Sequence, residues 1–231
     1  MCGRIAIHSD PVRCVQRFGV EQTVAAGWPR QERYNIHPVD RPGELEGSYV
    51  PVIRELEGRR YAHNFLWGPV FKMRDGWKRV INAKLERLQE SPLWRQAVKA
   101  GRFGIVPADG YYEWEKRASG PKQPYFVRRR DGEPMALPAL WGSSPIEPDG
   151  AKESTCVIVT TNPRGGIEKI HSRMPLEIPA DLFGDWLTGR CDLRELQAVD
   201  PTPEWEWWPV SRRVNNPRAD GAELIERVEA S

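Results

Sequence analysis

The residue with the most distinctive chemistry stands second in the chain, in Met1-Cys2-Gly3-Arg4. Removal of Met1 would leave a cysteine that carries both a thiol and a free α-amine. This 1,2-aminothiol condenses with an aldehyde to a five-membered thiazolidine ring. An internal cysteine cannot do so, because its nitrogen is held in a peptide bond. The alternative interpretation is that Cys2 is an incidental residue of a frayed chain end.

Three polar residues in the body of the chain have the chemistry to assist such a nucleophile. Glu113 lies between Tyr112 and Trp114, and a carboxylate among aromatic rings is suited to proton transfer; the alternative is a strand residue that faces water. His171 follows a glycine-rich loop and is either an acid/base group or a structural histidine. Asn82 stands where a strand-like run gives way to a helical one, and it either orients a reactant or caps that helix.

Together the four residues form the inventory of a covalent reaction at a carbonyl group. Cys2 supplies the nucleophile, Glu113 and His171 are acid/base candidates, and Asn82 is a neutral hydrogen-bonding group. The sequence contains no Gly-x-Ser-x-Gly elbow and no glycine-rich phosphate loop. The four cysteines form no Cys-x-x-Cys pair, so we expect neither a zinc site nor another metal, and no small-molecule cofactor.

Composition limits the remaining possibilities. The 231 residues are 39% hydrophobic and 29% charged, with a net charge of +2, so any contact with nucleic acid must come from a local cationic patch. The sequence shows no signal peptide and no apolar stretch that approaches the roughly 20 residues of a membrane span. We therefore expect a cytoplasmic protein with free thiols and no membrane partner.

The pattern of elements that must position these residues predicts an α+β fold. A single domain over residues 1–231, with a core of about 2–225, is the simplest organisation. We expect residues 33–38 to form an extended entry segment. Alternating runs predict strands over 3–7, 50–56, 60–67, 103–106, 111–115, 123–129, 135–141 and 155–161, those from 103 to 141 in a β-meander. Helical character is expected within 10–27, with Val12, Val15 and Phe18 on one face, and over 83–88, 91–100, 180–188 and 193–198.

Several short motifs occur in a fixed order along nearly the whole chain. They are Met1-Cys2-Gly3-Arg4, Arg33-Tyr34-Asn35, Trp67-Gly68, Asn82-Ala83-Lys84-Leu85-Glu86, Ala108-Asp109-Gly110-Tyr111-Tyr112-Glu113-Trp114, Ile170-His171-Ser172-Arg173-Met174-Pro175, Pro209-Val210-Ser211 and Gly221-Ala222-Glu223-Leu224-Ile225. In this combination the chain resembles the SRAP family, the SOS response-associated peptidases, also called abasic-site processing proteins. The resemblance covers residues 2 to about 225.

The resemblance implies a specific activity. Family members recognise abasic sites in single-stranded DNA and cross-link to them through the N-terminal cysteine, and they are also proposed to cleave their own leader residue. Carried over, Cys2 is the covalent residue and Asn82, Glu113 and His171 are its catalytic companions. The family fold is a compact α+β domain with a twisted, barrel-like antiparallel sheet and flanking helices. The expected partner is single-stranded DNA with abasic sites, bound by a monomer associated with the nucleoid.

Cations and one tryptophan close to these residues are the expected DNA contacts. Arg4, Lys84 and Arg173 each lie within two residues of a catalytic candidate and could cradle phosphates. Trp67 could stack on an exposed base, or it could simply pack in the core. Lys84 replaces the arginine that is usual in the family, so a phosphate contact there loses the bidentate fork.

Two other classes of function also use these residues. A processed Cys2 could act as the nucleophile of an amidohydrolase or peptidase, with Asn82 as an oxyanion donor. A non-catalytic module could bind single-stranded nucleic acid on Trp67 and the cations alone.

Overall fold

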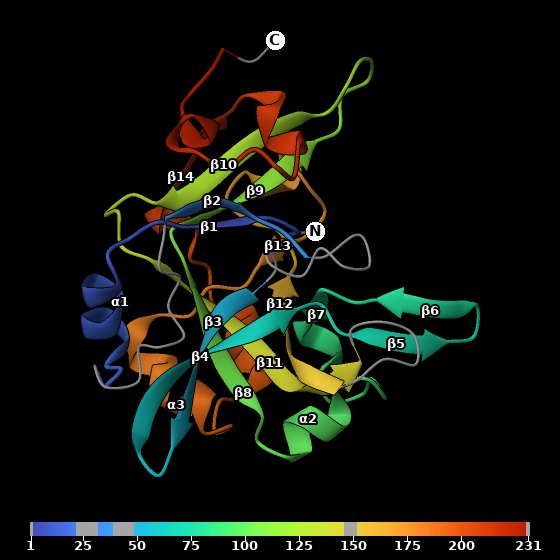
Figure 1. Cartoon of the computed structure of the whole chain (residues 1–231), viewed down its shortest axis with the longest axis vertical. Coiled ribbons are helices and arrows are strands. Elements are labelled where there is room, and N and C mark those ends of the chain that lie inside the picture. The colour runs from blue at the N-terminus through green and yellow to red at the C-terminus, as the bar shows by residue number, and fades with distance from the viewer. Residues whose placement is uncertain (1, 22–31, 39–48, 146–151, 230–231) are drawn as a thin grey trace.

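Five strands of the chain close into a barrel. The computed structural model describes residues 2–21, 32–38, 49–145 and 152–229 (Figure 1). The barrel strands are β3 (Tyr49–Leu56), β4 (Arg59–Trp67), β8 (Phe103–Ala108), β11 (Met135–Pro145) and β12 (Lys152–Thr161). They are hydrogen-bonded in the order β11–β8–β3–β4–β12, and β12 also pairs with β11, which closes the ring. The β12–β4 contact is parallel, and the other barrel pairings are antiparallel.

A second, antiparallel sheet lies above the barrel in Figure 1. It has the order β14–β10–β9–β1–β2, and its strands are β1 (Ile5–Ile7), β2 (Arg33–Ile36), β9 (Gly110–Glu115), β10 (Gln123–Arg129) and β14 (Trp205–Pro209). Ile5 pairs with Tyr111, and the Tyr112 N–H donates to the Arg4 carbonyl at 2.9 Å. This register ties the beginning of the chain to the strand that carries Glu113.

Shorter elements complete the fold. The hairpin β5 (Val70–Met73) and β6 (Gly76–Arg79) projects to one side (Figure 1). Two short strands, β7 (Asn82–Lys84) and β13 (Met174–Pro175), pair with β12. The α-helices are α1 (Pro11–Phe18), α2 (Arg95–Lys99), α3 (Phe183–Leu187) and α4 (Leu193–Ala198). Single 3-10 turns are η2 (Leu85–Arg87), η3 (Ile167–Lys169), η4 (Ala180–Leu182), η5 (Thr202–Glu204), η6 (Arg212–Asn215) and η7 (Ala222–Ile225).

Local sequence explains where the longest helix begins and ends. The Asp10 carboxylate accepts from the Val12 N–H and Pro11 opens the first turn, both of which favour a helix N-terminus. Gly19 ends α1 with a φ of 62°, a left-handed conformation that glycine adopts without steric cost. The expected apolar face is confirmed for two of its three residues: Val15 and Phe18 are buried, but Val12 is exposed.

Two apolar clusters use the two faces of the barrel strands. One lies under the helices and includes Phe18, Phe103 and Trp186. The other joins the barrel to the second sheet, and it contains Cys2 together with Trp67 and other buried residues. Alternate residues of one strand serve different clusters, as period-two side-chain alternation requires: Val157 belongs to the first, and Cys156 and Ile158 to the second. The N-terminal cysteine is therefore a core residue.

The expected α+β class, with a barrel-like antiparallel sheet and flanking helices, is confirmed, and strands occupy the ranges predicted from alternation. Two expectations are wrong. The strands after residue 103 do not form a meander, because β9 and β10 belong to the second sheet whereas β8 and β11 pair in the barrel. The helix expected at 83–88 is a strand followed by one 3-10 turn, because residues 82–84 pair with β12. Residues 22–27 of the predicted helical region lie outside the described residues.

No helix in the described ranges is long and apolar enough to cross a membrane.

Gly110, the first residue of β9, tests the close packing that holds this strand. A Cβ atom there would lie 2.6 Å from the Val127 carbonyl oxygen and would overlap the Phe126 ring. We expect Gly110→Ala to lower the free energy of unfolding by about 3 kcal/mol, since a backbone oxygen cannot move aside cheaply. Urea unfolding measures this.

Gly142→Ala in β11 is the matched control, because its Cβ would meet only Arg102 Nη1 at 3.8 Å. We expect it to change stability by less than about 0.5 kcal/mol. Equal stabilities for the two variants would contradict the close approach at Gly110.

Candidate active site

Cys2 lies at the centre of the candidate site, and its side chain has no exposure to solvent. Burial raises the pKa of its thiol well above the usual range, and the nearby Glu113 carboxylate raises it further. The backbone N–H of Arg4 hydrogen-bonds to the sulfur and acts in the opposite direction. In this environment the thiol holds its proton at neutral pH, so its use as a nucleophile requires a group that removes the proton.

Glu113 is the carboxylate near Cys2 that could accept the thiol proton. Its residue is 3% exposed, and Oε1 accepts the Trp114 N–H at 3.2 Å. Oε2 lies 3.9 Å from Nδ1 of His171. Glu113 faces the core with Tyr111 because residues two apart on a strand share a face. The alternative of a solvent-facing strand residue is therefore wrong.

His171 has one nitrogen surrounded by both kinds of hydrogen-bonding partner. Nδ1 is 3.1 Å from the Arg173 N–H and 3.2 Å from the Arg173 carbonyl oxygen, besides its approach to Glu113. The N–H suits an Nδ1 that accepts, whereas the two oxygens suit an Nδ1–H that donates. Which role this nitrogen takes depends on the tautomer of the ring.

Asn82 contributes an amide group with unused hydrogen-bonding capacity. It opens β7 opposite Ile158 of β12, so it is not the helix cap that was the alternative interpretation. Both Oδ1 and Nδ2 are buried, and neither has a hydrogen-bond partner among the described residues. A buried amide without partners is costly, and a bound reactant would supply them.

The fold brings the four residues into one region from four separate parts of the chain. Cys2 packs in the same buried cluster as one close neighbour of each of the other three residues. These neighbours are Ile158, which pairs with Asn82; Ile170, which precedes His171; and Tyr111, which stands two residues before Glu113. Glu113 is near enough to Cys2 to raise its pKa, His171 lies 3.9 Å from Glu113, and Asn82 borders the same apolar cluster through its partner Ile158. These residue types are the ones that covalent chemistry at a carbonyl requires.

Two of the expected DNA contacts have other roles in the structure. Arg173 is 8% exposed and holds Glu86 with two hydrogen bonds of 2.7 and 3.0 Å. It also donates to Asn162 Oδ1 and the Thr160 carbonyl, both at 2.7 Å. Burial favours the neutral acid of Glu86, but Arg173 outweighs this and lowers the Glu86 pKa. Because its guanidinium is already bonded within the protein, Arg173 braces the loop of His171 rather than presenting a free cation to phosphate.

Trp67 is the second correction. Its side chain is fully buried, and the indole N–H donates to the Ile81 carbonyl at 2.8 Å. No face of the ring is available for stacking on a base, so the core-packing alternative describes it.

The other two expected cations lie at the surface. Lys84 is exposed at the end of β7, and no carboxylate of the described residues lies within ion-pair distance of it. Arg4 is half-buried, with its guanidinium 5.4 Å from the centre of the Trp114 ring and within 3.3 Å of Asn35 Oδ1 and the Asn215 carbonyl.

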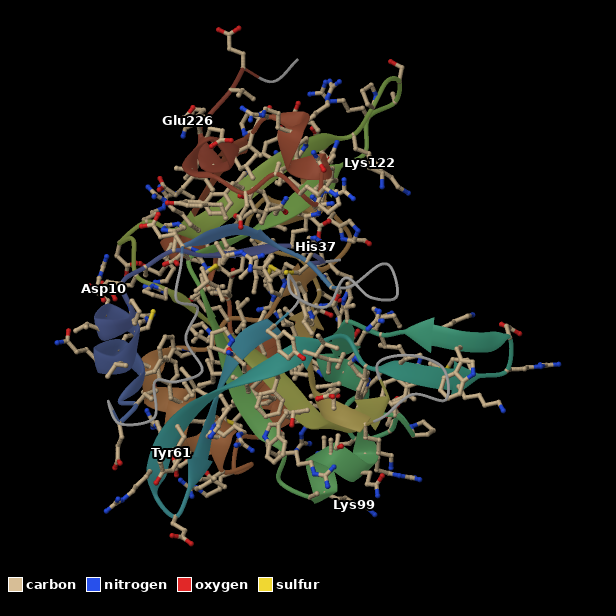
Figure 2. The ribbon with its side chains drawn as sticks, viewed as in Figure 1. Asp10, His37, Tyr61, Lys99, Lys122 and Glu226 are labelled. Carbon is tan, nitrogen blue, oxygen red and sulfur yellow. The ribbon has the colours of Figure 1, made fainter. Side chains whose placement is uncertain are left out.

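A hollow of about 420 Å³ is lined by Gly3, which follows Cys2 in the chain, and by Arg4, Trp114, Pro121, Lys122 and Asn215. Figure 2 labels Lys122, which extends from the β9–β10 hairpin. The sequence did not point to Lys122, because nothing in its loop indicates that the loop lies near the N-terminal residues. That proximity appears only once β9 pairs with β1. Sequence reasoning also missed Tyr111 as a neighbour of the site, although the alternation Tyr111, Glu113 could have placed both on one face.

No group of three or more His, Cys, Asp and Glu side chains within the described ranges is placed to hold a metal ion.

Known proteins resemble this chain over nearly its full length. The abasic site processing protein YedK of Escherichia coli is 30% identical, in an alignment that covers 99% of this chain and all of that protein. The abasic site processing protein HMCES of Gallus gallus is 25% identical, covering 99% of this chain and 78% of its own length.

Solved structures show the same fold. A phage-related protein from Bordetella bronchiseptica matches with a TM-score of 0.67 and 28% identity, covering 91% of this chain and 95% of that one. A Bacteroides thetaiotaomicron protein matches with a TM-score of 0.74 at 17% identity and shows the fold alone. The family model for SOS response associated peptidase (SRAP) matches residues 1–217. From this match and these relatives we conclude that the chain belongs to the SRAP family.

Proposed function

We propose that this protein processes abasic sites in single-stranded DNA by forming a covalent link through Cys2. The observation that carries the proposal is the placement of a fully buried Cys2 against Glu113, with His171 3.9 Å from the same carboxylate. Family membership and the names of the relatives supply the substrate class. The proposed chemistry requires only a monomer, and we propose that it acts in association with the nucleoid, where its DNA is found.

The reaction begins with loss of Met1, because the Cys2 nitrogen must become an amine. A small residue at position 2 suits removal by an aminopeptidase. Self-cleavage, with the Cys2 thiol or an activated water attacking the Met1 carbonyl, is the peptidase activity that we assign to the same site. The freed amine, with an ordinary pKa of about 7.7–8.0, is partly neutral at physiological pH.

The amine then attacks the aldehyde of the ring-opened abasic sugar. The carbinolamine that forms loses its hydroxyl as water and becomes a protonated imine. The Cys2 sulfur attacks the imine carbon: a C–S bond forms, the C=N electrons return to nitrogen, and the S–H proton leaves. Glu113 takes and returns protons in these steps, and His171 protonates the sugar ring oxygen during opening. Asn82 holds the amine or a sugar hydroxyl with its otherwise unpartnered amide.

The DNA strand requires positive charge near Cys2. The hollow next to Gly3 offers Arg4 and Lys122 together with Trp114, and Lys84, two residues beyond Asn82, is exposed at the end of β7. Phosphates bound at these positions place the abasic sugar over the buried thiol, and the aromatic ring adds a contact for a flanking base.

Replacement of the cysteine tests the covalent step. We expect the wild-type protein, mixed with an oligonucleotide that contains one abasic site, to form an adduct that survives denaturant. We expect Cys2→Ala to form none, because it has neither thiol nor ring closure. Intact mass spectrometry measures Met1 loss and adduct mass in one experiment.

Cys191→Ser is the control, since this half-buried thiol lies far along the chain in the turn before α4; its adduct yield should equal that of the wild type. An adduct in Cys2→Ala would refute the covalent assignment. Hydrolysis of small amides without any adduct would favour the amidohydrolase alternative, and salt-sensitive binding alone, unchanged by the substitution, would favour the non-catalytic module.

The cations give a second prediction. We expect Lys84→Ala and Lys122→Ala each to weaken binding of single-stranded DNA about equally for all sequences. Each should reduce the slope of log K against log salt by about 0.7, the share of one phosphate contact. Fluorescence anisotropy at several salt concentrations measures the slope.

Lys99→Ala at the end of α2 is the control, because this exposed lysine lies at the opposite end of the molecule from Lys122 (Figure 2). A salt slope unchanged from the wild type in both site variants would contradict the proposed path of the strand.

A further inference from the structure

The hydroxyl of Tyr111 is a buried polar group without a hydrogen-bond partner among the described residues, and the residue has no exposure to solvent. Arg17, Arg54 and Arg173 each have one buried nitrogen without a partner, but each is charged and interacts through its other atoms. Asn82 and Tyr111 are the buried neutral side chains left with no partner at all within the described ranges. Tyr111 shares a buried cluster with Cys2.

The strand register places Tyr111 beside the N-terminal residues. It pairs with Ile5 and shares its face of β9 with Glu113. It belongs to the same buried cluster as Cys2. Its ring packs edge-on against Trp205, with centroids 5.8 Å apart. Tyr111 therefore packs in the buried cluster that encloses the thiol, near enough for negative charge on Cys2 to raise its pKa.

Electrostatics around the ring leave the hydroxyl as a proton-bearing donor. Burial raises the Tyr111 pKa well above its usual range, and negative charge on Cys2, Glu113 and Glu177 raises it further. Glu177 is not its partner, because the two Glu177 oxygens accept from Arg129 and from the Trp205 indole.

A buried hydroxyl without a partner does not stabilise the folded protein. Phenylalanine would fill the same space without burying an unpaired polar group, and a buried donor with no acceptor destabilises the folded state. A group that costs stability beside a reactive thiol points to use during the reaction.

The reacting sulfur is an acceptor that could use this donor. Ring closure passes through a sulfur that carries negative charge, in a site where burial and Glu113 oppose that charge. The Arg4 backbone N–H is one donor to it. We propose that the Tyr111 hydroxyl is a second donor, which donates a hydrogen bond to the Cys2 sulfur once the thiol proton has left.

The Tyr111 proton is not transferred in this step. The thiol proton goes to Glu113, the sulfur forms its bond to the imine carbon, and the hydroxyl stabilises the sulfur until that bond is made. The charged and titratable groups that face this point from neighbouring elements are Glu113, His171, Glu177, Arg129 and the freed Cys2 amine. They are the same in a Tyr111→Phe variant, which removes only the hydroxyl.

The proposal deepens the proposed function, and the test separates the two. The first measurement needs no DNA: Cys2 is modified with methyl methanethiosulfonate from neutral to alkaline pH, and peptide mass spectrometry follows each cysteine. We expect Tyr111→Phe to move the Cys2 profile to higher pH by about one unit, the effect of one hydrogen bond to a charged group. The profile of Cys156, buried in the same cluster, should stay unchanged and serves as the internal control.

The second measurement is the rate of cross-linking at saturating abasic DNA. We expect Tyr111→Phe to slow it about tenfold with DNA affinity unchanged, while its melting temperature equals or exceeds that of the wild type. Tyr112→Phe is the matched control on the opposite face of β9, where the hydroxyl donates to the Tyr34 carbonyl at 2.7 Å. It should lose stability and keep the wild-type Cys2 profile.

An unchanged Cys2 profile in Tyr111→Phe overturns the proposal, whatever happens with DNA. A clear drop in its melting temperature also overturns it, because the hydroxyl would then have a structural partner. If the wild type forms no adduct, the proposed function fails, and the modification profile still decides the role of Tyr111.

Discussion

The pairing of β1 with β9 is the constraint on which the site depends. A chain end normally frays, and a cysteine there would be exposed, mobile and chemically ordinary. Here backbone hydrogen bonds from β9 hold the residues just after Cys2, and the thiol is packed between the second sheet and the barrel. The same strand carries Glu113 and Tyr111, so one ladder of hydrogen bonds positions both Cys2 and the groups that we propose act on it.

Burial of the thiol creates the chemical problem that the surrounding residues must solve. A thiol removed from water and set near a carboxylate resists ionisation, which protects it from unspecific reaction. It reacts only when a base accepts the proton and donors receive the charge. Under the proposed function the Glu113–His171 pair and the polar groups of Asn82 and Tyr111 have these properties. The unpartnered amide of Asn82 and the unpartnered hydroxyl of Tyr111 cost stability in the folded protein.

Positive charge is divided between scaffold and surface. The Arg173 guanidinium donates hydrogen bonds to Glu86, Asn162 and Thr160. These bonds hold the Arg173 backbone in place, and its N–H donates to His171 Nδ1. A planar fork with five donors suits this internal bracing better than a lysine would. Lys84 and Lys122, single point charges on flexible stems, remain at the surface, where the proposed function uses them to bind phosphates.

Alternation and turn residues were enough to find most strands, and the order of motifs singled out Cys2, Asn82, Glu113 and His171 as candidates, because these signals are local. The sequence by itself therefore determined the residue types of the candidate site and most of its secondary structure. Only the tertiary structure decided that β8 and β9 go to different sheets, that residues 82–84 become a strand, that Trp67 and Arg173 face inward, that Lys122 shares a hollow with Gly3, and that Tyr111 shares a buried cluster with Cys2. The physical reason is that strand pairing and burial join residues about a hundred positions apart, and neither propensity nor spacing along the chain specifies which distant partner a strand will meet.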